Sequence, residues 1–250
     1  MRPRILSGYL FLLPFLFPLK SNAQLKINFP AKDGLNVTAD WYPVADSLPV
    51  ILLCHQAEYS RGEYIQTALK LNKFGFNCLA IDQRCGNEIN GVKNETAVEA
   101  ARRKKGQTNL DAEQDITGAI DYLYEKYKKR IILMGSSYSA SLVLKIAKEN
   151  DRVFAVAAFS PGEYFEQKDF VAKHIDGLNK PVFVTSSRQE ADAVTDLVKD
   201  VGSMIKLQYI PIAAGDHGSK VLWSINSYNE EYWIALMSFL DKMKKIERHE

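Results

Sequence analysis

Two hydrophobic patterns alternate along most of the chain. Short runs of nearly continuous hydrophobic residues are typical of strands that are buried on both faces of a parallel sheet. Six such runs occur at residues 50–54, 78–81, 131–134, 153–159, 182–185 and 207–210. The segments between these runs place hydrophobic residues three or four positions apart, which is the spacing of an amphipathic helix.

The helical spacing is clearest over residues 111–127. Ala112, Ile116, Ile120 and Leu123 fall on one side of a helix there. The same pattern predicts helices over residues 63–74, 140–149, 191–201 and 231–244. Strands and helices in this alternation predict an α/β fold, with a mostly parallel sheet covered by helices on both faces.

The segment that precedes these elements has the alternating pattern of an exposed sheet edge. Val37, Ala39 and Trp41 alternate with polar residues, and Lys32-Asp33-Gly34 is a turn signal. Residues 25–28 and 36–42 are therefore predicted to form a hairpin, which adds an antiparallel N-terminal edge. Together with the six later runs, this predicts a central sheet of about eight strands.

The first 23 residues have the features of a secretory signal peptide. Arg2 and Arg4 precede a hydrophobic run over residues 5–19, and the small residues Ser21 and Ala23 follow it. The run is short for a membrane span and contains two prolines. We therefore predict cleavage after residue 23, export to the periplasm or the cell exterior, and no stable membrane span in the mature chain. The alternative is an uncleaved membrane anchor.

The remaining residues, 24–250, are predicted to form a single domain. Residues 86–109 are polar and exceed the usual length of a strand-to-helix connection, which indicates a loop insertion. Such a loop either covers a site or is a solvated excursion, and the sequence leaves both open.

The net charge gives no reason to expect a nucleic-acid partner. The 250 residues include 32 basic and 30 acidic side chains, for a formal charge of +2. Removing the three basic residues of the predicted signal leaves 29 basic and 30 acidic residues, a net charge of −1. A nearly neutral chain has no electrostatic attraction for nucleic acid or for an anionic membrane surface.

Disulfides are not expected to be the framework of the fold. Cys54, Cys78 and Cys85 are odd in number, so at least one thiol is unpaired within the chain. Buried free thiols are the default interpretation. A bond between Cys54 and Cys85 stays open, because they lie at or just after the ends of predicted strands that could be neighbours.

A run of small residues directly follows the predicted strand at 131–134. Gly135-Ser136-Ser137-Tyr138-Ser139 is similar to the nucleophile elbow G-x-S-x-G, in which a serine sits on a sharp turn between strand and helix. Small residues are needed two positions before and after the nucleophile so that strand and helix can approach. Gly135 meets this requirement, and Ser139 replaces the usual glycine. Ser137 is the candidate nucleophile; the alternative is a serine-rich helix start that only caps.

A serine hydroxyl needs a base that accepts its proton. His217 lies in a glycine-flanked loop after the last predicted strand, so it follows the nucleophile as the base does in α/β-hydrolases. His55, His174 and His249 fit less well, because they precede the elbow, precede the next strand and lie in the charged tail, respectively. We predict that His217 is the base.

The acid that orients the base is expected in the loop after the strand at 182–185. That loop contains Glu190 and Asp192. The distance from the strand favours Glu190, with Asp192 as the alternative, and either residue could instead cap the helix that follows.

The site also needs two N–H groups aimed at the substrate oxygen on which negative charge develops. The backbone N–H of Tyr138, at the start of a helix, is the first candidate, and that of Gln56, after the strand at 50–54, is the second. Glu58, Tyr59 and Arg61 are candidates for the entrance and for substrate binding.

Two charged residues on the same rim of the sheet are further candidates. Asp82 and Arg84 follow the strand at 78–81. Both could bind substrate, but the favoured interpretation is that Asp82 and Arg84 pair with each other or bond to nearby backbone, and so hold adjacent loops. His55 is likewise expected to brace its loop.

These segments together resemble the α/β-hydrolases, in particular small dienelactone-hydrolase-like and acyl-esterase members. The resemblance covers nearly the whole predicted mature chain. It rests on four segments: Cys54-His55-Gln56, Asp82-Gln83-Arg84, Gly135-Ser136-Ser137-Tyr138-Ser139 and Gly215-Asp216-His217-Gly218. It implies the α/β-hydrolase fold and hydrolysis. Dienelactone hydrolases use a cysteine nucleophile, whereas this elbow carries a serine.

The sequence therefore predicts a secreted serine hydrolase that cleaves a small carboxylic ester through an acyl-enzyme. The alternatives are a serine peptidase, an acylaminoacyl hydrolase or a thioesterase. An alternative of another class is a catalytically silent binding protein on the same scaffold. No motif for a metal or cofactor is found, and the chemistry needs neither. The oligomeric state stays open.

Overall fold

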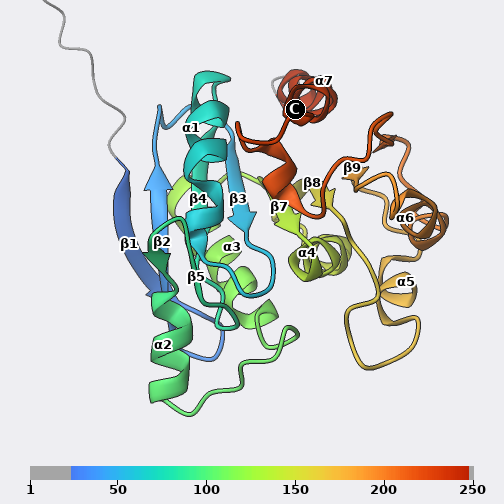
Figure 1. Cartoon of the computed structure of the whole chain (residues 1–250). Helices are drawn as coiled ribbons and strands as arrows, with labels where there is room; N and C mark the ends of the chain where they lie inside the picture. Colours follow the sequence, from blue (N-terminus) through green and yellow to red (C-terminus); the bar gives the residue numbers. More distant parts are fainter. Residues whose placement is uncertain (1–23, 248–250) are drawn as a thin grey trace, which may run out of the picture.

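The computed structural model describes residues 24–247, and its centre is one eight-stranded sheet (Figure 1). The strand order is β1-β2-β4-β3-β7-β8-β9-β10. The strands are β1 (Leu25–Pro30), β2 (Asn36–Tyr42), β3 (Val50–Cys54), β4 (Asn77–Ile81), β7 (Ile131–Ser136), β8 (Val153–Phe159), β9 (Val182–Thr185) and β10 (Lys206–Tyr209). β2 pairs antiparallel with β1 and with β4, and all other pairs within this eight-stranded sheet are parallel. The predicted fold class is confirmed, including the antiparallel N-terminal edge.

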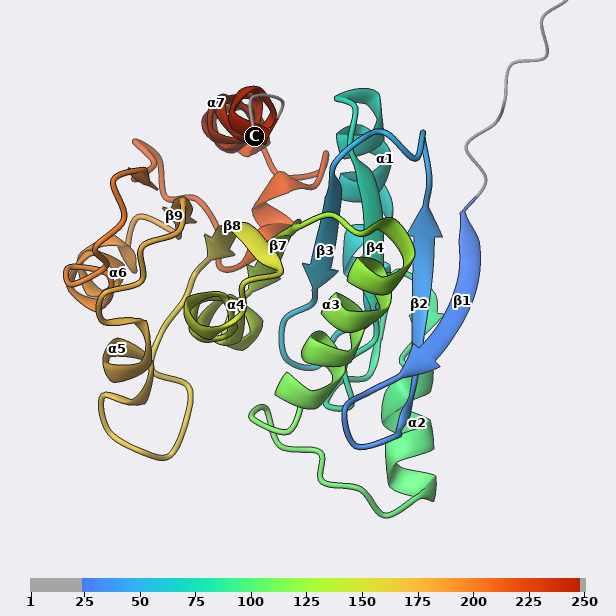
Figure 2. The same ribbon diagram turned by 180° about the vertical axis from the view of Figure 1, so that it is seen from behind.

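Helices cover both faces of the sheet. They are α1 (Ile65–Lys73), α2 (Glu95–Arg102), α3 (Glu113–Tyr127), α4 (Tyr138–Glu149), α5 (Phe170–Ile175), α6 (Ala191–Leu197) and α7 (Asn229–Glu247). α1 lies in front of the sheet in Figure 1, and α3 lies in front of it in Figure 2. Two short 3₁₀ helices, η1 (Arg61–Tyr64) and η2 (Ser219–Leu222), precede α1 and α7.

Successive strand residues enter two different cores. Leu52 of β3 packs in the cluster that contains α3 and α4, whereas its neighbours Ile51 and Leu53 pack in the cluster that contains α1 and α7. Side chains alternate between the faces of a strand. Since both faces are covered, every position of β3 must be hydrophobic, and this explains the continuous runs in the sequence.

The segment 86–109 differs from the predicted loop. It contains a two-stranded hairpin, β5 (Glu88–Ile89) and β6 (Val92–Lys93), followed by α2. Asn94 caps α2, because its side-chain oxygen accepts the backbone N–H of Ala97 at 2.7 Å. The buried face of α2 is made of Thr96, Ala97 and Ala100, which are small side chains rather than the large hydrophobic ones of the other helices.

All three cysteines are free thiols. Cys54 and Cys78 are buried, and burial raises the pKa of both thiols well above the usual range. Cys54 lies beside Ile81 in the sheet register. Ile81 is four residues before Cys85 in the chain. Cys85 instead donates a hydrogen bond to the Tyr138 hydroxyl over 3.1 Å. The Cys54–Cys85 bond is therefore not formed.

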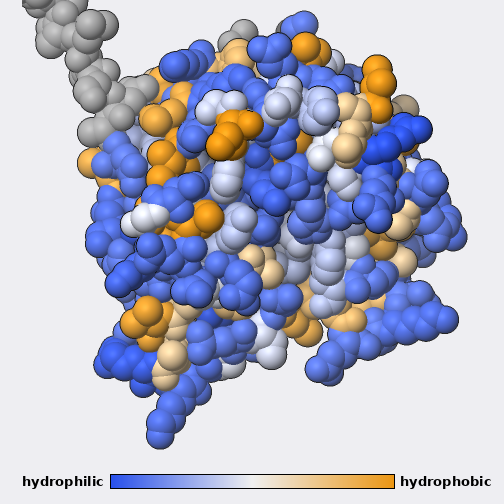
Figure 3. Space-filling model, viewed as in Figure 1, coloured by the Kyte–Doolittle hydropathy of each residue, from blue (hydrophilic) through white to orange (hydrophobic). Residues whose placement is uncertain are grey.

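The described helices include none with the length and hydrophobicity of a membrane span. On the face shown in Figure 3, hydrophobic residues occur in small separate groups among hydrophilic ones. The predicted signal peptide, residues 1–23, and His249 lie outside the described residues.

Candidate active site

The elbow between β7 and α4 holds Ser137 in a sharply turned conformation. Its backbone angles are φ 58° and ψ −125°, and α4 begins at the next residue. Gly135 permits this turn, since a Cβ atom there would lie 2.5 Å from the Ser139 carbonyl oxygen and 2.7 Å from the Ala140 nitrogen. Strand and helix can therefore approach only because position 135 has no side chain.

Ser137, His217 and Glu190 form one chain of hydrogen bonds. The Ser137 Oγ lies 2.9 Å from His217 Nε2, and His217 Nδ1 is hydrogen-bonded to Glu190 Oε1. The three residues come from the elbow, the loop between β10 and η2, and the loop that leads into α6. The structure thus brings together the three residues selected from the sequence, in the geometry of a nucleophile, a base and an orienting acid.

Glu190 is held in its ionised form. Its Oε2 accepts hydrogen bonds from the Ser160 hydroxyl (2.8 Å), the Ser187 hydroxyl (2.8 Å) and the Ser187 backbone N–H (3.1 Å). Burial alone would raise the pKa of Glu190, but the hydrogen bonds from His217, Ser187 and Ser160 outweigh it and lower the pKa to about 2. Sequence reasoning missed both serines, because nothing in the local pattern indicates their partner.

Asp192, the alternative acid, lies in the first turn of α6 and is exposed. No hydrogen bond joins its side chain to His217 among the described residues. A negative charge in a first helical turn favours the helix. The structure therefore places Asp192 outside the hydrogen-bonded chain.

The N–H of Gln56, predicted as an oxyanion donor, already donates a hydrogen bond within the protein. It donates to Glu63 Oε2 over 2.8 Å, which corrects the prediction. The N–H of the next residue, Ala57, has no hydrogen-bond partner among residues 24–247. The N–H of Tyr138 is the first of α4 and has no partner within the helix.

His55 braces the loop after β3, as expected. It is fully buried, its Nε2 accepts the backbone N–H of Gln83 (2.9 Å), and its Nδ1 lies 2.8 Å from the Gln56 carbonyl oxygen. Burial lowers the pKa of His55 to about 4, although the two backbone hydrogen bonds oppose this shift. A neutral imidazole that donates from Nδ1 satisfies both contacts.

Ser139, at the position where an elbow usually has glycine, also ties this loop in place. Its hydroxyl donates to the His55 carbonyl oxygen over 2.6 Å and accepts a hydrogen bond from the Gln83 side chain. The departure from glycine therefore gives α4 a polar contact with the loop after β3.

Arg61 is a buried structural residue rather than an entrance residue. Its guanidinium contacts Asp82 (2.6 Å), Glu95 (2.9 Å) and Asp40 (3.1 Å), and its side chain is 7% exposed. Glu58, by contrast, is exposed, with a positive φ of 63°. Tyr59 is half-buried and stacks on Trp223, with ring centroids 6.3 Å apart.

Arg84 is likewise unavailable to a substrate. Its guanidinium binds Asp115 (2.8 Å) and Asp33 (2.9 Å), and its side chain is 2% exposed. Asp82 and Arg84 thus hold adjacent loops, as favoured from the sequence, although each pairs with another partner. Asp115 lies on α3 and is fully buried.

Replacing Asp115 with Ala should lower the free energy of unfolding by about 3–5 kcal/mol, because Arg84 would stay buried with half of its partners. Asp121→Ala is the control on the same helix: its pairs with Lys32 and Arg152 are both partly exposed, and the loss should stay at about 1 kcal/mol or below. Urea denaturation measures both. Equal losses in the two variants would contradict this account of Arg84.

Two hollows flank the hydrogen-bonded chain. One, of about 440 Å³, is lined by Leu110, Tyr164, Phe165 and Phe170 together with polar residues of the same two loops. Tyr164 lies edge-on to the His217 ring, with ring centroids 6.5 Å apart. The other hollow, of about 850 Å³, is bordered by Glu190, His217 and the loops that carry them.

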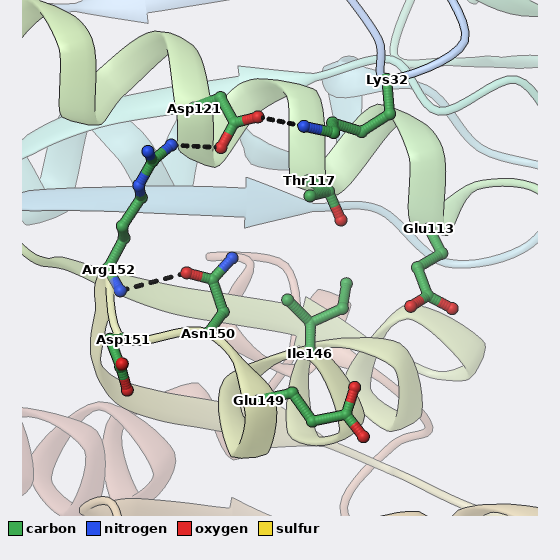
Figure 4. Close-up of a pocket in the computed structure, with 9 residues that line it drawn as sticks. All are labelled: Lys32, Glu113, Thr117, Asp121, Ile146, Glu149, Asn150, Asp151 and Arg152. Carbon is green, nitrogen blue, oxygen red and sulfur yellow. Dashed lines mark hydrogen bonds and ion pairs between the residues drawn. The ribbon is translucent and has the colours of Figure 1, made fainter.

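A third hollow, of about 450 Å³, is lined mostly by polar residues, and Ser137, Glu190 and His217 are not among them (Figure 4). Lys32 and Arg152 both bind Asp121 across it. It includes the loop that enters β8 at its amino end, whereas ligands of open α/β sheets bind at the carboxyl ends of strands. Residues 24–247 contain no cluster of side chains suited to a metal ion.

No protein-family model matches the sequence, and no curated protein matches it in sequence. Solved structures do match. An esterase from Pyrococcus furiosus has a TM-score of 0.70 at 16% identity, covering 96% of this chain and 96% of the esterase. A dienelactone hydrolase from Anabaena variabilis has a TM-score of 0.65 at 14% identity, covering 87% and 95%. An acylaminoacyl peptidase from Pyrococcus horikoshii has a TM-score of 0.62 at 17% identity, covering 90% of this chain but 42% of the peptidase.

The chain therefore has the α/β-hydrolase fold that its motifs resemble. At these identities the likeness concerns the fold alone, so the chemistry has to be argued from the site.

Proposed function

We propose that the protein is a serine hydrolase that cleaves small carboxylic esters. The observation that carries this is the continuous hydrogen-bonded chain from Ser137 through His217 to Glu190. Ser137 Oγ attacks the ester carbonyl carbon while His217 Nε2 takes the hydroxyl proton. His217 then gives that proton to the leaving alkoxide, and an acyl-enzyme remains. Water, deprotonated by His217, releases the carboxylic acid and restores Ser137.

Two features supply the electrostatic support for this sequence of steps. Glu190 carries a full negative charge at neutral pH, which stabilises the imidazolium that forms on His217. The free N–H groups of Tyr138 and Ala57 are the proposed donors to the oxyanion.

The test is a hydrolysis assay of the chain from residue 24 on matched p-nitrophenyl esters, thioesters and aminoacyl anilides. Preferred turnover of the esters is expected. Preferred turnover of anilides or thioesters would replace the proposed substrate class and keep the mechanism. No turnover, with intact binding of an ester analogue, would indicate a silent binding protein.

The hollow beside Tyr164 is the proposed site for the acyl group. Tyr164 borders both this hollow and His217, and Leu110, Phe165 and Phe170 give the hollow apolar walls. Polar residues line the rest of it, and its volume of about 440 Å³ is enough to hold an acyl group.

Filling this hollow with Leu110→Trp should lower kcat/KM for a butyrate ester about tenfold relative to the acetate ester, since only the longer acyl group needs the space. The control is Ile234→Trp on α7, where the native side chain is 72% exposed. The measured quantity is the butyrate-to-acetate ratio of kcat/KM. An unchanged ratio in Leu110→Trp would place the acyl group elsewhere.

We also propose that the protein is exported. The support is the basic start, hydrophobic run and small residues of positions 1–23. N-terminal sequencing of the protein recovered from cell fractions tests this: a mature chain that begins near Gln24 outside the cytoplasm is expected, and an intact N-terminus in the cytoplasm would refute it.

A further inference from the structure

The buried carboxylate of Glu63 is hydrogen-bonded to Gln56, the residue before the proposed oxyanion donor Ala57. Glu63, in η1, is fully buried, and among the described residues no basic side chain forms an ion pair with it. Burial raises the pKa of Glu63 to about 6, despite hydrogen bonds from Ser219 and Gln56 that lower it. Burying a carboxylate without a cation is unfavourable. The reaction steps proposed above leave this group without a role.

The two oxygens of Glu63 join two loops of the proposed site. Oε2 accepts the backbone N–H of Gln56 at 2.8 Å, and Oε1 accepts the Ser219 hydroxyl at 2.5 Å. Gln56 immediately precedes Ala57, and Ser219 lies two residues after His217. One side chain thus contacts both the loop of the proposed oxyanion donor and the loop of the proposed base.

Further contacts join the same loops around Glu63. The carbonyl oxygen of Glu63 accepts the indole N–H of Trp223 at 2.8 Å. The backbone N–H of Ser219 donates to the hydroxyl of Ser136 over 2.8 Å, and Ser136 directly precedes the nucleophile. The space at Gly218 cannot hold a side chain, because a Cβ atom there would lie 2.4 Å from the Gln56 side-chain oxygen.

We propose that Glu63 is a positioning residue, whose two carboxylate oxygens set the distance between the Ala57 N–H and His217. This inference rests on the proposed function. Its physical basis is reach: only a side chain of this length can accept both hydrogen bonds at once from its place in η1. Misplacing a catalytic group by about 1 Å can reduce the rate about 100-fold.

Two substitutions of Glu63 distinguish the effect of its side-chain length from the effect of its charge. Glu63→Asp keeps the charge but withdraws the carboxylate by one methylene, so it cannot contact both donors. Glu63→Gln keeps the length: its carbonyl oxygen can accept from the Gln56 N–H, and its amide can donate to the Ser219 hydroxyl, which also serves as an acceptor. The control is Glu88→Asp, at an exposed position on β5 outside the site.

The experiment measures kcat and KM for an acetate ester, together with the melting temperature, in all three variants. We expect Glu63→Gln to keep kcat within about threefold of the wild type, and Glu63→Asp to lose about 100-fold in kcat with KM changed less than about threefold. Glu88→Asp should match the wild type.

The inference is overturned if folded Glu63→Asp is as active as Glu63→Gln, or if its loss is in KM instead of kcat. If Glu63→Asp does not fold, Ser219→Ala replaces it: removal of one of the two contacts should lower kcat without raising KM, and an unchanged kcat overturns the inference. An inactive wild type would instead refute the proposed function, so the two failures are distinguishable.

Discussion

Replacing Ser137 with Ala is expected to reduce ester hydrolysis by about 10⁴- to 10⁶-fold without unfolding the protein. The variant keeps the elbow conformation but removes the hydroxyl oxygen that lies 2.9 Å from His217 Nε2. Without that nucleophile no acyl-enzyme forms, and the oxyanion donors alone give a small residual rate. The measurement is kcat/KM on an acetate ester, alongside the melting temperature.

The same variant identifies the nucleophile directly. A fluorophosphonate should form an adduct on Ser137 of the wild type, located by peptide mass spectrometry, and no adduct in Ser137→Ala. The matched control is Ser136→Ala, the neighbouring residue, which should keep the adduct on Ser137. An adduct on another serine in the Ser137→Ala protein, or retained hydrolysis, would show that the nucleophile has been assigned wrongly.

Glu190→Gln is expected to lower kcat by about 10³- to 10⁴-fold. An amide of the same size removes the negative charge that stabilises the imidazolium, and it can present an N–H group to His217 Nδ1. Asp192→Asn is the matched control, two residues away and exposed, and it should stay within about twofold of the wild type. A large loss in Asp192→Asn with little loss in Glu190→Gln would exchange the two assignments.

Glu190 also predicts how stability depends on pH. Its pKa in the folded protein is about 2, below the ordinary value of 4.5, so the folded state holds this proton less tightly than the unfolded chain does. Its stabilising contribution is therefore fully present above about pH 4.5 and is lost as the pH falls toward 2. Urea denaturation at pH 6 and pH 3 should show a smaller difference for Glu190→Gln than for the wild type. An equal difference would mean that other carboxylates account for the acid sensitivity.

Much of this protein could be predicted from its sequence because the signals are local. The continuous hydrophobic run of β3 follows from burial on both faces, and Gly135 follows from the close approach of β7 and α4. The order of Ser137, Glu190 and His217 along the chain follows from the succession of strands, since each residue comes after the strand that carries its loop. Parallel strands bring those loops to the same edge of the sheet.

Other features could not be predicted from local patterns. α2 buries mainly alanine and threonine, so a polar stretch of sequence concealed a helix. One partner of Arg84 is Asp115, 31 residues away and on another element. Arg61 likewise lies among carboxylates from several elements. A charged residue near a rim looks the same in sequence whether it faces a substrate or a buried partner.

The sequence by itself determined the strands of the central sheet, the turn at the elbow, and Ser137 and His217 of the hydrogen-bonded chain, because hydrophobic period, residue size and chain order specify them. It limited the acid to Glu190 or Asp192. The tertiary structure decided which polar groups are free. In the folded protein the Gln56 N–H donates to Glu63, whereas the Ala57 N–H has no partner among the described residues. The fold also places Glu190 rather than Asp192 within hydrogen-bond distance of His217. The reason is that a hydrogen bond between distant residues depends on distances of a few tenths of an ångström, which only the packing of whole elements sets.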